Sequence, residues 1–138
     1  MKYIIAGMRD FHDYEYFRAY MKLLSPFLEI TEVVSGGAKG VDAMGEYWSK
    51  ENDIKLKVFT AEWDKLGKRA GHVRNHKMAM YADGLIAFWN GSSRGTADMI
   101  KTAQKEGLEG YVVRTDILWN KKYENGLPQL NNVQPIIG

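Results

Sequence analysis

The segment ADGLIAFWNGSSRGTADMI, residues 82–100, passes from an apolar run through a polar turn into a helix-like stretch. The apolar run 85–89 is typical of a buried β-strand, because it is short and bounded by turn-forming residues. The turn 90–96 contains two glycines and three hydroxyl side chains. Such a turn is either a tight connection with Thr96 as the helix cap, or a place where backbone amides bind an anion, most often a phosphate.

The same alternation of strand-like and helix-like segments runs through most of the chain. It predicts an α/β fold of the Rossmann-like, doubly wound type: a mostly parallel five-stranded sheet with helices on both faces. Ligands of such folds bind outside the carboxyl ends of the strands. We expect strands at 3–6, 32–35, 55–59, 85–89 and 111–114, helices at 13–28, 41–51, 70–81 and 96–106, and a loop at 60–69.

The last segment, 115–138, differs in composition from the domain predicted over 1–114. It is rich in asparagine and contains two of the three prolines. We expect it to be part of the same domain, either as an edge hairpin with Glu124-Asn125-Gly126 as its turn or as an arm that docks on a partner subunit.

Length and composition exclude several classes of protein. A chain of 138 residues suits one compact domain. The absence of cysteine excludes disulfides and thiolate metal sites, and no stretch approaches the roughly 18 consecutive apolar residues of a membrane span. We therefore expect a cytoplasmic protein without a membrane partner. A net charge of +2 and a pI near 8.7 are too weakly basic for a dedicated nucleic-acid binder.

Two glycine motifs follow predicted strands near the start of the chain. In AGMRDF (6–11), Gly7 permits close approach of a ligand and Arg9 carries a charge for it. In VVSGGAKGVD (33–42), a glycine loop opens a helix, and helix N-termini attract anions. The loop matches neither GxGxxG nor GxxxxGK[ST], so it predicts phosphate binding without ordinary dinucleotide or ATPase chemistry. Its candidate ligand-binding residues are Ser35, Gly36, Gly37, Lys39, Gly40 and Asp42.

A third glycine motif is the turn of the opening segment. Its candidate ligand-binding residues are Asn90, Gly91, Ser92, Ser93, Gly95 and Thr96, with Trp89 as a surface on which a base stacks. Trp63 also lies near a predicted strand end and is a second candidate surface for stacking of a base.

The predicted helix 70–81 contains the last candidates. His72 and His76 have the i, i+4 spacing of metal ligands, but Val73 replaces the glutamate of HExxH and no third ligand is evident. We therefore predict neither a metal nor a cofactor, and assign Arg74 to an anionic ligand instead.

The segments IAGMRDF (5–11), VVSGGAKGVDAMGEYW (33–48) and VFTAEWDKLGKRAGHVRNHKMAMYADGLIAFWNGSSRGTADMI (58–100) together resemble the small stand-alone members of the SLOG superfamily. The resemblance covers residues 3–113. It implies a Rossmann-like domain related to the lonely-guy phosphoribohydrolases and the DNA-processing A protein. It also implies a nucleotide-derived ligand, ADP-ribose-like molecules included. Relatives of this type often pair, so we expect a homo-oligomer.

The lonely-guy enzymes cleave the N-glycosidic bond of nucleoside monophosphates with a helix arginine and a PGGxGTxxE loop. Arg74 matches that arginine, Gly91, Gly95 and Thr96 resemble the loop, and Asp98 stands in for the glutamate. The proline and the double glycine are missing, and aspartate is one methylene shorter than glutamate. These departures weaken an enzymatic interpretation more than a binding one, since cleavage needs a carboxylate held close to the sugar.

Three functional hypotheses follow. The first is a binding module for a nucleotide-derived small molecule, acting as a sensor or as a sponge with which a phage counters host nucleotide signalling. The second is a phosphoribohydrolase in which Arg74 and Asp98 are catalytic. The third is a single-stranded DNA binder that uses the basic stretch 65–77, against which the low net charge argues.

Overall fold

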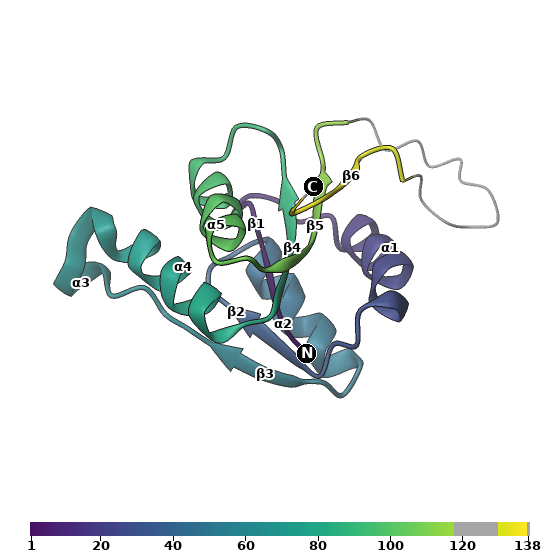
Figure 1. Ribbon diagram of the computed structural model, residues 1–138, viewed down its shortest axis with the longest axis horizontal. Coiled ribbons are helices and arrows are strands. Elements are labelled where there is room, and N and C mark those ends of the chain that lie inside the picture. The colour runs from purple at the N-terminus through teal and green to yellow at the C-terminus, as the bar shows by residue number, and fades with distance from the viewer. Residues whose placement is uncertain (118–129, 138) are drawn as a thin grey trace.

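A six-stranded sheet crosses the computed structural model (Figure 1), which describes residues 1–117 and 130–137. The strand order is β3-β2-β1-β4-β5-β6. The first five strands are parallel to their neighbours, and β6 pairs antiparallel with β5. The strands are β1 (Lys2–Gly7), β2 (Glu32–Ser35), β3 (Lys55–Val58), β4 (Gly84–Trp89), β5 (Glu109–Arg114) and β6 (Val133–Pro135).

The helices lie in the four places that the periodicity predicts. They are α1 (Tyr14–Leu24), α2 (Val41–Glu51), α4 (Ala70–Tyr81) and α5 (Arg94–Lys105). The first is shorter than expected and gives way to a 3-10 turn, η1 (Ser25–Phe27), because a proline at position 26 disfavours continuation of an α-helix. The loop expected at 60–69 is wrong in part, since α3 (Trp63–Leu66) and η2 (Gly67–Arg69) occupy it. Single turns are too short to show a helical period in sequence.

Helices cover both faces of the sheet, as a doubly wound fold requires. Side chains alternate between the faces of each strand, so neighbouring strand residues enter different cores. One core packs β1 against α1 and α2 through Tyr3 and Ile5, and the other contains Ile4 of β1 together with residues of α4 and α5. The predicted Rossmann-like architecture is therefore confirmed.

The switch point of this topology lies at β1. The chain winds from β1 outward to β2 and β3, then crosses to β4 on the other side of β1. Loops that leave β1 and β4 consequently diverge, and this divergence opens the crevice in which such folds bind their ligands.

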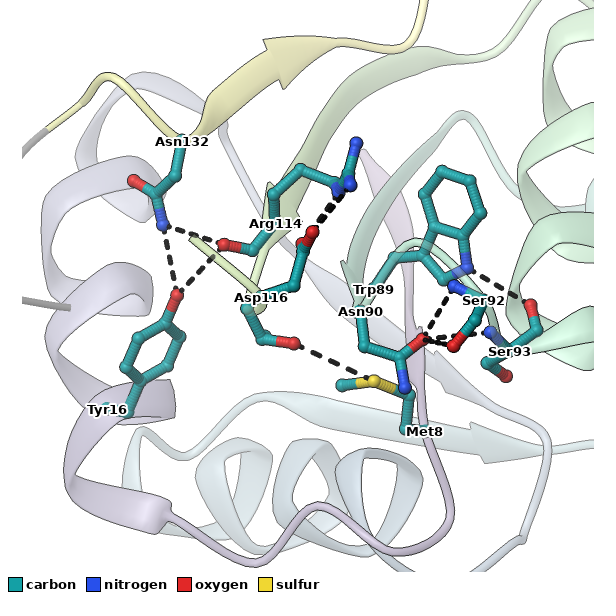
Figure 2. A network of polar contacts seen from close by, with 10 residues as sticks. Met8, Tyr16, Trp89, Asn90, Ser92, Ser93, Arg114, Asp116 and Asn132 are labelled. Carbon is teal, nitrogen blue, oxygen red and sulfur yellow. Dashed lines mark hydrogen bonds and ion pairs between the residues drawn. The ribbon is translucent and has the colours of Figure 1, made fainter. Parts of the chain in front are cut away.

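The sixth strand comes from the C-terminal segment. Val133 pairs with Val113 in the β5–β6 ladder. The buried Asn132 before it donates to Tyr16 Oη at 3.0 Å and to the Arg114 carbonyl oxygen at 3.1 Å (Figure 2). The predicted turn 124–126 lies outside the described residues, and docking of this segment on a partner stays a prediction. Among the described helices, none has the length and apolarity that crossing a membrane demands.

Gly40 provides a test of how tightly the loops after β1 and β2 pack against each other. Its φ is +71°, and a Cβ there would overlap the Met8 carbonyl oxygen, which accepts a hydrogen bond from the Val41 amide at 3.2 Å. We expect Gly40→Ala to lower the free energy of unfolding by about 3 kcal/mol or more, because left-handed strain and a backbone clash add together. Denaturant titration followed by circular dichroism measures the loss.

The matched control is Gly107→Ala. Gly107 has a similar φ of +74°, but nothing lies within 4 Å of the place that a Cβ would take there. This variant carries the left-handed strain alone, about 1 kcal/mol. Equal losses in the two variants would show that the contact with Met8 does not constrain the fold.

Candidate functional site

A cavity of about 730 Å³ opens at the carboxyl edge of the sheet, beside the switch point. This volume lies within the range of small-molecule sites. Its walls are the ends of β1 and β2, the segment that follows β3, the N-terminal half of α4 and the first turns of α5.

Most of the residues predicted from the glycine motifs line this one cavity. Asp98, the candidate catalytic carboxylate of the hydrolase hypothesis, lines the cavity as well. The predicted ligand-binding residues on its walls are Gly7, Arg9, Gly36, Gly37, Lys39, Asp42, Arg74, Ser93, Gly95 and Thr96. Ser35, Gly40, Trp89, Asn90, Gly91 and Ser92 do not line it.

Ser35 and Gly40 support the loop after β2 through contacts outside the cavity. The buried Ser35 hydroxyl donates to Glu46 Oε2 at 2.7 Å and accepts from the Gly37 amide at 3.1 Å. Gly40 lets α2 begin against the backbone of Met8. Both residues therefore hold the loop in place without facing the cavity.

The segment from Trp89 to Ser92 has a similar supporting role (Figure 2). Trp89 Nε1 donates to the Ser93 carbonyl oxygen at 3.1 Å, and the Arg114 guanidinium lies 5.1 Å from the centre of its ring. Asn90 Oδ1 accepts from the Ser92 and Ser93 amides at 2.9 and 2.8 Å. The indole of Trp89 therefore interacts with its own loop and with Arg114, and it does not line the cavity.

Two helices present their N-terminal ends to the cavity. The cap of α5 is Ser93 rather than Thr96: Ser93 Oγ accepts from the Thr96 amide at 3.4 Å, and the helix begins two residues earlier than predicted. The first amides of a helix have no partner within it, and they carry the positive end of the helix dipole. Arg94 and Gly95 in the first turn of α5 line the cavity, as do Gly36 to Lys39 before α2.

Asp42 and Arg74 approach each other over Gly36. A Cβ on Gly36 would lie 2.8 Å from Asp42 Oδ2 and 3.0 Å from Arg74 Cζ, so only glycine fits between them. Arg74 Nη1 donates to the Gly36 carbonyl oxygen at 2.9 Å, and Asp42 Oδ2 accepts from the Ala38 amide at 3.2 Å. Burial raises the pKa of Asp42 to about 6, an effect that the Ala38 amide and Arg74 oppose.

His72 and Asn75 are site residues that sequence reasoning missed. His72 Nδ1 lies 2.8 Å from Asp98 Oδ1, and Asn75 Nδ2 donates to Asp98 Oδ2 at 2.9 Å. Asn75 Oδ1 accepts from Arg74 Nε at 3.3 Å, so the chain of contacts continues to the arginine. The i, i+3 spacing of His72 and Asn75 was the available signal, since it places both on one helix face. Among the described residues, no three histidine, aspartate or glutamate side chains form a metal-binding group.

The segment after β3 is the other wall that the sequence did not predict. It contributes Thr60, Ala61, Trp63 and Lys68 to the cavity. Within the basic stretch 65–77, Lys68 and Arg74 face the cavity. Part of that positive charge therefore belongs to the candidate site.

The comparisons with known proteins agree with this fold. Residues 1–66 match the model of the YspA, cpYpsA-related SLOG family. This match supports membership of the SLOG superfamily. The chain is also 35% identical over 82 residues to the Gene 61 protein of Mycobacterium phage D29. That alignment covers 55% of this chain and 66% of the phage protein. No solved structure matches this chain.

The buried carboxyl of Asp42 gives the protein a defined pH dependence of stability. Its folded-state pKa of about 6 exceeds the ordinary value of 3.8, so the native protein binds a proton more tightly than the unfolded chain. The contribution of Asp42 therefore falls as pH rises through this window. We expect the free energy of unfolding of the wild type, relative to Asp42→Asn, to fall by about 2 kcal/mol between pH 4 and 6.

Denaturant titrations at a series of pH values measure this difference. Asp64→Asn, which removes an exposed carboxylate outside the cavity, serves as the control. If the difference in free energy of unfolding between the wild type and Asp42→Asn did not change with pH, the raised pKa of Asp42 would be contradicted.

Proposed function

We propose that this protein binds a nucleotide-derived small molecule, ADP-ribose-like or a nucleoside phosphate, in the cavity at the switch point. The observation that carries the proposal is the opening of two helix N-termini onto one cavity with an excess of positive charge. Five cationic side chains line it against two carboxylates: Arg9, Lys39, Lys68, Arg74 and Arg94, against Asp42 and Asp98.

The two helix ends suit phosphate groups. The exposed Gly37 leaves the backbone before α2 accessible, and Gly95 does so in the first turn of α5, with open space where its Cβ would be. Because the amides come from two separate helices, the cavity has room for two phosphates of one ligand. A diphosphate such as that of ADP-ribose uses both ends, and a monophosphate uses one.

The polar wall between the helix ends suits a ribose. Asp98 accepts hydrogen bonds from two neighbours, and a carboxylate has capacity for further donors such as sugar hydroxyls. A similar protein occurs in a phage, and we propose that the ligand is held intact, by a sponge or a sensor for a host nucleotide signal.

Arg74 provides the test of ligand binding. We expect Arg74→Met to weaken ADP-ribose binding by about tenfold or more, because it removes a charged donor from the phosphate end. Isothermal titration calorimetry measures the dissociation constant, and circular dichroism shows whether the fold survives loss of the bond to Gly36.

The control is Arg18→Met, which removes a mostly exposed arginine of α1 outside the cavity. It should bind ADP-ribose like the wild type. Equal ADP-ribose affinity of the two variants would show that Arg74 does not bind the phosphate groups in this cavity. Absence of binding to AMP, ADP-ribose and NAD by the wild type would refute the proposal.

Cleavage of a nucleoside monophosphate is the second candidate function, and the placement of Asp98 favours it. His72 and Asn75 hold both carboxylate oxygens, so this group has the fixed orientation that glycoside cleavage requires. In such a reaction the bond between C1′ and the base nitrogen breaks, water adds to C1′, and the base departs with a proton. Asp98 would stabilise positive charge at C1′ or accept the proton of the water.

Incubation with AMP separates the two functions. For a binder we expect intact AMP to be recovered from the denatured complex by chromatography with mass detection. Release of adenine and ribose 5-phosphate would contradict binding without turnover. In that case Asp98→Asn should abolish the release while AMP still binds, because the amide keeps the shape of the carboxyl and removes its charge.

A further inference from the structure

Trp63 is a large aromatic side chain left half exposed at the rim of the cavity. It is the first residue of α3, and 54% of its surface is exposed. Its ring packs against the start of α4, where a Cβ on Gly71 would lie 3.3 Å from Trp63 Cη2. A tryptophan whose ring edge lies near a glycine while about half of its surface stays exposed is suited to stacking with a planar ligand.

The polar groups of the site continue directly from this ring. Gly71 precedes His72, which contacts Asp98. On the opposite wall, a Cβ on Gly37 would lie 3.5 Å from Thr60 Cγ2, so the segment that leads to Trp63 borders the glycine loop. The cavity therefore combines an aromatic ring at Trp63, a carboxylate at Asp98, and helix N-termini accompanied by cationic side chains.

The other aromatic residues of the described part of the chain are not placed to stack on a ligand in this cavity. Trp48 is buried in the core, and Trp89 is held by Arg114 and Ser93. Across residues 1–117 and 130–137, no other tryptophan, tyrosine or phenylalanine lines the cavity.

We propose that Trp63 stacks on the base of the ligand and thereby makes the cavity selective for nucleotides over sugar phosphates that lack a base. This inference rests on the proposed function and assigns its specificity to a residue of the α3 segment. The lining offers a group for each part of a nucleotide: Trp63 for the base, Asp98 for the ribose and the helix N-termini for the phosphate.

The test compares AMP with ribose 5-phosphate, which share the sugar and phosphate and differ in the base. Isothermal titration calorimetry is performed on the wild type, Trp63→Ala and Trp63→Phe. We expect Trp63→Ala to weaken AMP binding by about tenfold and to change ribose 5-phosphate binding by less than about twofold, because stacking contributes only when a base is present. Trp63→Phe keeps a ring and should retain most of the affinity for AMP.

Phe27→Ala is the matched control, since it removes an aromatic ring that is 82% exposed outside the cavity. Its affinities should equal those of the wild type. Unchanged AMP binding in Trp63→Ala, or an equal loss for both ligands, would overturn the stacking role while leaving the phosphate site intact. A wild type that binds none of AMP, ADP-ribose and NAD would refute the proposed function itself.

Discussion

The close approach of three backbone segments at the carboxyl end of β1 is the constraint on which the site depends. A Cβ on Gly7 would lie 2.6 Å from the Phe88 carbonyl oxygen and 2.7 Å from Val41 Cγ2, so no larger residue fits between β1, β4 and α2. The Val41 amide donates to the Met8 carbonyl oxygen across the same junction. Because Gly7 adds no side chain at this junction, the loops after β1 and β2 and the start of α5 can share the walls of one cavity.

The charged groups of that cavity are oriented by the protein before any ligand arrives. Arg74 is held by the Gly36 carbonyl and by Asn75, and Asp98 is held by His72 and Asn75. Asn75 is buried and links the cation to the carboxylate, so the two cannot move independently. Groups fixed in this way lose little conformational freedom on binding, which favours affinity for a small polar molecule.

The sequence predicted five of the six strands, the four longer helices and the glycine loops beside the cavity, because hydrophobic periodicity and glycines after strands report local structure directly. It failed where the outcome depends on distant contacts. Trp89 and Trp63 both follow strands, and the spacing alone could not show that Arg114 covers the first while the second stays open. The segment 60–69 was missed as a wall because its helical turns are shorter than the period that reveals a helix.

The C-terminal segment explains why Trp89 supports the site instead of contacting a ligand. Asn132 fixes the backbone at Arg114, whose guanidinium lies over Trp89 and packs against Gly91 (Figure 2). Thr115 Oγ1 meets Met8 Sδ at 3.7 Å, so the same segment also reaches the loop after β1. An edge strand thus stabilises two site loops from the side away from the cavity. This support holds the two loops beside the cavity, while its aromatic side chain, Trp63, comes from the segment after β3.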